Sequence, residues 1–135
     1  MLLFKTSAAT LDSVIYNKKH ALKHEPKNWE KNEILLISKN KVDCKKGEKQ
    51  IQFIMNLDSI KKYGNTEIKK FWPDAANNWE YLVDCNTVVK LDKPFDLSDV
   101  IGVSAEGFKP SLKPKKILGD DEKKILTYLK GIKAI

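Results

Sequence analysis

Residues 71–102 (FWPDAANNWEYLVDCNTVVKLDKPFDLSDVIG) decide the fold, because they place an aromatic-rich loop directly before a long strand. The alternation of apolar and polar residues over 79–91 predicts that strand, with a bulge near Asn86. After it, Asp96 is expected to cap a short helix that Gly102 ends. Working outward from this stretch, we expect the remaining elements to pack around the long strand.

Two tryptophans, Trp72 and Trp79, belong to this aromatic-rich loop. Rings in a loop indicate side chains held at a surface cleft, where they can stack on a flat ligand. The residues leave a second interpretation open, in which both rings close one end of a barrel core, since large rings are usually buried on average.

The beginning of the chain predicts a strand followed by a helix. Residues 2–6 form an apolar run of strand length, and Ser7 or Thr10 can cap a helix that carries Leu22 on its apolar face and ends at Pro26. The helix would place the two histidines four residues apart on one side.

Further strands and a last helix follow from apolar runs and their breakers. Residues 33–38 form a continuous apolar strand, and in 50–57 the alternation of Ile51, Phe53, Met55 and Leu57 predicts one buried face. Residues 39–49 read as a lysine-rich loop, and 58–78 as a long loop with a short strand at 68–70. The acidic turn after Gly119 opens a helix that ends near Gly131.

The elements together predict an α+β fold, a curved mixed β-sheet or pseudo-barrel with peripheral helices. At 135 residues the chain suits one domain, residues 1–135, with 41% apolar and 32% charged residues, as in soluble globular proteins. The apolar runs are too short to cross a bilayer, and the start MLLFK is a poor signal peptide, so we expect a cytoplasmic protein.

The charge balance points to a polyanionic partner. The net charge is +7, and all 25 basic residues are lysines. Lysines neutralise phosphates as point charges. The chain has no arginine, so it cannot form the bidentate hydrogen bonds by which a guanidinium group recognises a base edge. The lysine excess also fits a role in solubility or ion pairing, and the sequence leaves that alternative open.

Residues suited to catalysis or metal binding are few. His20 and His24 lack an HExxH context and a third ligand, which favours surface or cleft histidines over a metal site. Cys44 and Cys85 form no CxxC pair, which favours reduced thiols, although the sequence does not exclude a disulfide. We therefore expect no cofactor, no metal and no catalysis by this chain itself.

The order of these strings resembles the PUA-like superfamily, and within it the EVE and YTH domains that bind modified bases. MLLFKTSAATLD looks like the family's first strand and helix, KNEILLISKN and QIQFIMNL like two of its strands, and FWPDAANNWEYLV like its Trp-Pro loop and following strand. The ending KKILGDDEKKILTYL resembles the basic and acidic close of EVE domains. The resemblance spans nearly the whole chain.

The resemblance implies a pocket into which a flipped base is inserted. Trp72 matches the stacking tryptophan, Trp79 a further wall, and Lys5, Thr6 and Ser7 the polar edge after the first strand. The family's second cage tryptophan is missing, so Leu22 or His24 takes that place; Trp29 is an alternative wall, although we expect it to pack beneath the sheet edge. Phosphate contacts are assigned to Lys69, Lys70, Lys109, Lys113, Lys115 and Lys116.

The first function that this implies is a reader of methylated DNA, the specificity module of an McrBC-type restriction system. The chain would then be an N-terminal fragment whose motor and nuclease partners lie in missing regions. Two alternatives stay open: a PUA-like domain that binds RNA, and a small nucleoside-processing hydrolase of the ASCH type. Against the last, the Gly-x-Lys-x-x-Glu-x-Arg motif cannot exist in a chain without arginine.

Overall fold

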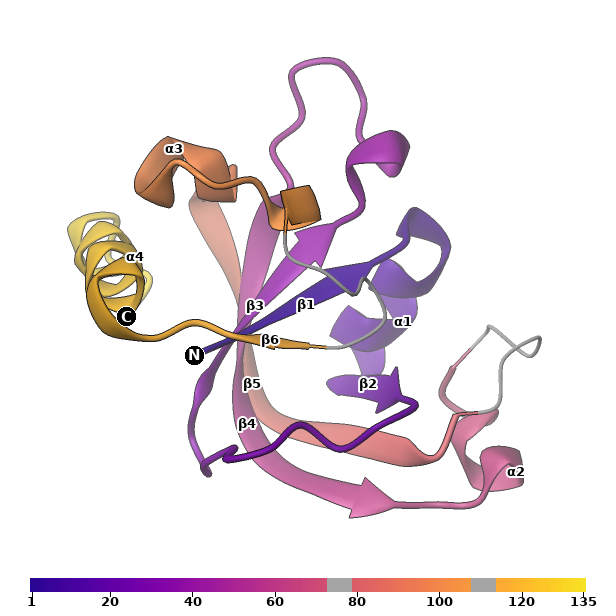
Figure 1. Cartoon of the computed structure of the whole chain (residues 1–135). Helices are drawn as coiled ribbons and strands as arrows, with labels where there is room; N and C mark the ends of the chain where they lie inside the picture. Colours follow the sequence, from indigo (N-terminus) through magenta and orange to yellow (C-terminus); the bar gives the residue numbers. More distant parts are fainter. Residues whose placement is uncertain (73–78, 108–113) are drawn as a thin grey trace.

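The computed structural model describes residues 1–72, 79–107 and 114–135 (Figure 1). The six strands in these ranges are β1 (Leu2–Thr6), β2 (Lys19–Leu22), β3 (Ile34–Lys39), β4 (Ile51–Lys62), β5 (Tyr81–Phe95) and β6 (Lys115–Lys116). The helices are α1 (Ala8–Asn17), α2 (Asn65–Ile68), α3 (Leu97–Ile101) and α4 (Gly119–Gly131), with 3-10 turns η1 (Lys41–Asp43) and η2 (Ala105–Gly107).

The strands form one mixed sheet in the order β2-β5-β4-β3-β1-β6, which confirms the predicted α+β fold with a curved mixed sheet. β1 and β3 are parallel, and the other neighbours are antiparallel. Figure 1 shows α1 and α4 on opposite sides of the sheet, and β4 and β5 as long, bent strands. The sheet therefore has apolar residues packed against both of its faces.

Each face carries its own hydrophobic core. Leu35 and Met55 lie in the core beneath α1, whereas Leu36 and Ile54, their neighbours in sequence, lie in the core beneath α3 and α4. Both cores include side chains with essentially no exposure to solvent. Because both faces are covered, the central strands read as continuous apolar runs and not as simple alternation.

The bulge predicted near Asn86 is present, because Asn56 pairs with Thr87 whereas Leu57 pairs with Cys85. The prediction that Ile51, Phe53, Met55 and Leu57 share one face is wrong for Ile51, which lies in the core beneath α3 and α4. The physical reason is a second register shift between Ile51 and Phe53, since one inserted residue moves a side chain to the other face.

The predicted helix up to Pro26 is wrong beyond Asn17. Lys18 adopts a left-handed conformation with φ of 55°, and its N–H donates to the carbonyl of Val14, which ends α1. The chain then enters β2, where Lys19–Leu22 pairs with β5. His20 and Leu22 are therefore strand residues, and the two histidines do not share a helix face.

The long loop predicted over 58–78 is also shorter than expected. β4 continues to Lys62, and α2 occupies Asn65–Ile68 in place of the expected strand at 68–70. In contrast, the short helix after Asp96 and the acidic helix α4 are confirmed. Gly102 ends α3 with φ of 75°, a conformation that costs glycine little. Among the described residues, no helix is both long and apolar enough to span a membrane.

Candidate nucleic-acid interface

The two tryptophans of the aromatic loop lie in the core beneath α1. Trp72 is 5% exposed and Trp79 is 7% exposed, so the prediction that they present their rings at an open surface cleft is wrong. Their ring centroids are 5.6 Å apart in an edge-on arrangement, and Trp72 also contacts the ring of His20 at 4.6 Å. The extent of β4 and α2 explains this, because the backbone N–H of Trp72 donates to the carbonyl of Ile68 at the end of α2, and both residues pack in the core beneath α1.

A polar pair is enclosed with these rings. His20 Nδ1 lies 2.8 Å from the carbonyl oxygen of Ala21, so this nitrogen carries the proton and donates. Nε2 then accepts a hydrogen bond from the Thr6 hydroxyl at 3.0 Å. Burial lowers the pKa of His20 to about 4, although the Ala21 carbonyl opposes this by raising the pKa, and the imidazole is neutral at pH 7.

The predicted base-pocket residues therefore divide into two groups. Thr6, Leu22, Trp72 and Trp79 come together, but all of them are buried. Ser7 stands at the start of α1, with its hydroxyl 2.9 Å from that of Thr10, which is a structural position. Lys5 is half-buried in β1 and, unlike Thr6, lines a separate hollow near η1. His24 lies at the surface in a different place.

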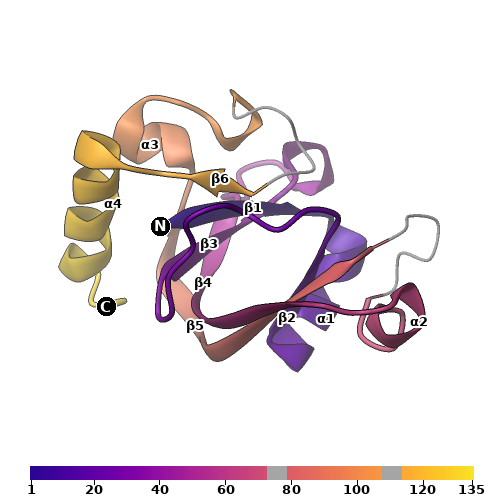
Figure 2. The same ribbon diagram turned by 60° about the horizontal axis from the view of Figure 1, so that its bottom comes forward.

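A larger open pocket, which we call the amino-terminal pocket, is lined by residues of the segment between β2 and β3 and of β6. The course of that segment and of β6 can be followed in Figure 2. Its cavity volume is about 910 Å³. Its lining consists of Met1, Leu2, His24, Glu25, Pro26, Lys27, Asn28, Glu30, Lys31, Asn32, Glu33, Pro114, Lys115, Lys116, Leu118 and Glu122. Pockets of this size hold small organic ligands.

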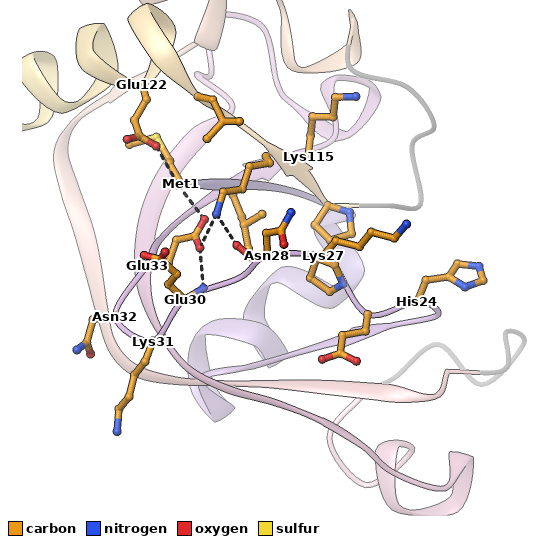
Figure 3. Close-up of a pocket in the computed structure, with 16 residues that line it drawn as sticks. Met1, His24, Lys27, Asn28, Glu30, Lys31, Asn32, Glu33, Lys115 and Glu122 are labelled. Carbon is orange, nitrogen blue, oxygen red and sulfur yellow. Dashed lines mark hydrogen bonds and ion pairs between the residues drawn. The ribbon is translucent and has the colours of Figure 1, made fainter.

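The floor of the amino-terminal pocket is held by an ion-pair network (Figure 3). The Glu33 carboxylate is 6% exposed and lies 2.8 Å from the Met1 amino group and 3.0 Å from Lys116 Nζ. Burial raises the pKa of Glu33, but the hydrogen bonds from Met1 and Lys116 outweigh this, and the pKa is lowered overall. Lys116 also donates to the Asn28 carbonyl at 2.8 Å, so this predicted phosphate contact instead fixes the segment between β2 and β3.

The rim of the pocket is basic on one side. Figure 3 shows the side chains of His24, Lys27 and Lys115 extending toward the same side of the pocket, away from Glu33. All three side chains are exposed. The other side of the lining offers carboxylates, among them Glu30 and Glu122. The pocket thus combines cations for phosphate with oxygen atoms that accept hydrogen bonds.

A second, smaller hollow lies against the same segment, and we call it the Trp29 hollow. Its cavity volume is about 380 Å³, and it is lined by Glu25, Pro26, Lys27, Asn28 and Trp29. Residues 25–28 line both hollows and form the ridge between them. Trp29 is half-buried, and its indole N–H donates to the Glu25 carboxylate at 3.1 Å, which fixes the ring.

The remaining predicted phosphate contacts do not join the pocket. Lys69 and Lys70 follow α2, and Lys70 pairs with Glu67 at 3.0 Å on an exposed surface. Lys109 and Lys113 lie outside the described residues. Of the six lysines, Lys115 and Lys116 are the two that line the amino-terminal pocket within the part of the chain that the structure describes.

Sequence reasoning missed Lys27, Asn28 and Glu33. Lys27 and Asn28 follow Pro26, and a polar, proline-interrupted segment between two strands is the kind of loop that carries binding residues. The apolar run over 33–38 predicts Glu33 as the first residue of a strand and not as part of a site. No local signal marks a carboxylate whose partners, Met1 and Lys116, are so distant in the chain.

The two cysteines line neither the amino-terminal pocket nor the Trp29 hollow. Cys44 and Cys85 are free thiols, and burial raises the pKa of Cys85 to about 12. Within the ranges described, no three histidine, cysteine or acidic side chains gather in a way that would hold a metal ion.

Comparison with known proteins defines the fold. No protein-family model matches the sequence, and no curated protein matches it significantly. Among solved structures, the crystal structure of ASCH from Zymomonas mobilis superposes with a TM-score of 0.63 at 8% identity, covering 93% of each chain. This chain has an ASCH-like fold. At 8% identity this likeness shows the fold alone, which agrees with the α+β fold expected from the sequence.

Two point variants of the same Zymomonas mobilis protein give the same result. One superposes on the chain with a TM-score of 0.60 over 94% of each chain, and the other with 0.56 over 93% of this chain and 96% of that chain, both at 8% identity. The ASCH-like fold therefore extends over at least 93% of this chain.

Proposed function

We propose that this ASCH-like chain binds single-stranded RNA and that the amino-terminal pocket receives one nucleotide of the strand. The observation that carries the proposal is that the side chains of His24, Lys27 and Lys115 extend toward one side of a cavity of about 910 Å³. Two of these residues, His24 and Lys115, were predicted as site residues from the sequence.

The lining supports RNA in two ways. Lysine ammonium groups attract phosphates without regard to base sequence, in keeping with the net charge of +7. Carboxylates such as Glu30 repel phosphates but accept hydrogen bonds from hydroxyl groups, and RNA differs from DNA by its 2′-hydroxyl. A recess also suits an unpaired nucleotide, because a base within a duplex does not leave its stack without cost.

Reading methylated DNA, the first function inferred from the sequence, is the weaker proposal. It requires an exposed aromatic cage, and Trp72 and Trp79 are both buried. Membership of a restriction system, with motor and nuclease partners, stays a prediction without support from the fold. A binding role without catalysis by this chain is part of the present proposal.

The test is a comparison of ligands by fluorescence anisotropy. We expect labelled oligo-uridine RNA to bind more tightly than the matched single-stranded DNA and than plain or methylated duplex DNA. The double variant Lys27→Ala/Lys115→Ala should weaken RNA binding at least tenfold, whereas Lys130→Ala/Lys133→Ala, with the same change in net charge, should not. Equal weakening by both variants, or preference for methylated duplex, would overturn the proposal.

A second candidate function, a nucleoside-processing hydrolase of the ASCH type, is favoured by the Thr6 and His20 pair. A hydroxyl that donates to a neutral imidazole at 3.0 Å, with the other ring nitrogen fixed by a carbonyl, is the arrangement of an activated nucleophile. Thr6 is, however, 2% exposed, which keeps substrate away. Release of product from acetylated or phosphorylated nucleosides by the wild type, lost in Thr6→Val, would establish this function.

A further inference from the structure

We propose that Trp29 is a base-stacking platform and that the ridge 25–28 holds two successive nucleotides, one in each hollow. The inference rests on the proposed function, since it names how an RNA strand continues beyond the amino-terminal pocket. It adds a residue that the sequence assigned to packing beneath the sheet edge.

The amino-terminal pocket and the Trp29 hollow share one wall, which supports the inference. Lys27 lines both the amino-terminal pocket and the Trp29 hollow, as do Glu25, Pro26 and Asn28. An exposed lysine on a ridge between two cavities is placed to bind the phosphate that joins two nucleosides, one on each side. A strand that crosses the ridge therefore puts neighbouring bases into neighbouring hollows.

The three tryptophans differ in their exposure to solvent, which also supports the inference. Trp72 and Trp79 are enclosed in the core, whereas Trp29 is half-buried and lines an open hollow. Its indole N–H donates to Glu25 at 3.1 Å, so the polar edge of the ring is already satisfied. Part of the ring packs against the core beneath α1, and the part that borders the Trp29 hollow is left for a ligand. Aromatic faces stack on bases with little sequence preference.

Hydrogen bonds and an ion pair hold the ridge in place without any ligand. Lys116 Nζ donates to the Asn28 carbonyl at 2.8 Å and pairs with Glu33 at 3.0 Å. The Asn32 N–H donates to the Leu57 carbonyl at 2.6 Å, which ties the same segment to β4. A ridge that is held on its carboxy-terminal side loses less conformational entropy when it binds than a free loop would.

The experiment measures oligo-uridine RNA binding by wild type, Trp29→Leu and Trp29→Phe, with Tyr16→Ala as the control. Tyr16 is an aromatic residue with 87% exposure that lines neither hollow. We expect RNA to quench the intrinsic fluorescence of the wild type. Trp29→Leu should lose that quenching and about tenfold in affinity, whereas Tyr16→Ala should bind as the wild type does.

Trp29→Phe keeps a ring that stacks, so it should retain most of the affinity while losing the quenching; it decides the question if Trp29→Leu does not fold. A uridine dinucleotide should also bind to the wild type more tightly than uridine monophosphate does. In Trp29→Leu this difference in affinity should disappear. If Trp29→Leu binds RNA as the wild type does while Lys27→Ala/Lys115→Ala does not, the stacking platform is refuted and the RNA function stands. If the wild type binds no single strand, both are refuted.

Discussion

The hydroxyl of Thr6, at the end of β1, lies 3.0 Å from Nε2 of His20 in β2 and donates to it. The other ring nitrogen donates to the Ala21 carbonyl, so both nitrogens of the neutral ring have partners. The pair links two strands that are not neighbours in the sheet. Protonation of His20 would place a second N–H against Thr6 and a charge beneath α1.

The first prediction is a loss of stability in mild acid. The pKa of His20 is about 4 in the folded protein and about 6.5 when unfolded. A lowered folded pKa contributes stability above the unfolded pKa, and that stability is lost as the pH falls from 6.5 toward 4. Between pH 7.5 and pH 5 we expect a loss of about 2 kcal/mol in the free energy of unfolding, measured by urea denaturation.

The two histidines provide the control for this experiment. His20→Gln should remove most of the pH dependence between pH 7.5 and pH 5, whereas His24→Gln, at an exposed position, should leave it unchanged. An unchanged slope in His20→Gln would show that other groups cause the effect.

The second prediction concerns the role of Trp72. The ring is buried, and its N–H has no hydrogen-bond partner among the residues that the structure describes. Trp72→Phe removes that unsatisfied donor, which offsets part of the lost packing, so we expect a change within about 1 kcal/mol. Trp72→Ala should cost about 3–5 kcal/mol through the cavity it leaves. Thermal denaturation measures both; a mild effect of Trp72→Ala would contradict a core position.

The fold was predictable to the extent that its signals were local. The strand β5, its bulge near Asn86 and the capped helix α3 follow from alternation, a break in alternation, and Asp96 and Gly102. The end of α1 was not predictable from the sequence, because Lys18 ends the helix in a left-handed conformation, where glycine or asparagine is usual. The apolar residues Ala21 and Leu22 then continued a helical pattern that is in fact a buried strand.

The candidate site was less predictable, because its parts come from distant segments. Lys115 and His24 carry charge that sequence can recognise, but nothing local shows that they face one cavity. Of the two interpretations left open for Trp72 and Trp79, burial in a core is the correct one, and Trp29 is the most exposed of the three tryptophans. Burial of Trp72 depends on how far β4 extends and on the turn α2, whereas Trp29 is kept at the surface by a ridge fixed through Lys116.

The third prediction concerns the network on the floor of the amino-terminal pocket. Glu33→Gln leaves Lys116 without its buried counter-charge and leaves the Met1 amino group paired with the part-exposed Glu122, and we expect a loss of about 3 kcal/mol in the free energy of unfolding. Glu67→Gln is the surface control, because its pair with Lys70 is exposed, and it should cost less than about 1 kcal/mol. Urea denaturation at pH 7.5 compares the two, and equal costs would refute a structural role for Glu33.

The fourth prediction is a change in the salt dependence of RNA binding. Each phosphate contact on a single strand contributes about 0.7 to the slope of log affinity against log salt concentration. If Lys27 and Lys115 each bind one phosphate, Lys27→Ala/Lys115→Ala should lower that slope by about 1.4. Anisotropy titrations over a series of salt concentrations measure it. A weaker affinity with an unchanged slope would mean that the variants alter the shape of the pocket and not its phosphate contacts.

The fifth prediction uses the backbone at the end of α1. Lys18 has φ of 55°, a region in which a side chain is strained and glycine is not. Lys18→Gly should therefore stabilise the protein by about 0.5–1 kcal/mol, even though glycine also gains freedom in the unfolded chain. Gly102→Ala is the reciprocal control, since φ is 75° there and alanine should destabilise. Thermal denaturation measures both variants. Because Lys18 immediately precedes β2, destabilisation by Lys18→Gly would mean that the lysine side chain contributes more to the entry into that strand than the strained backbone costs.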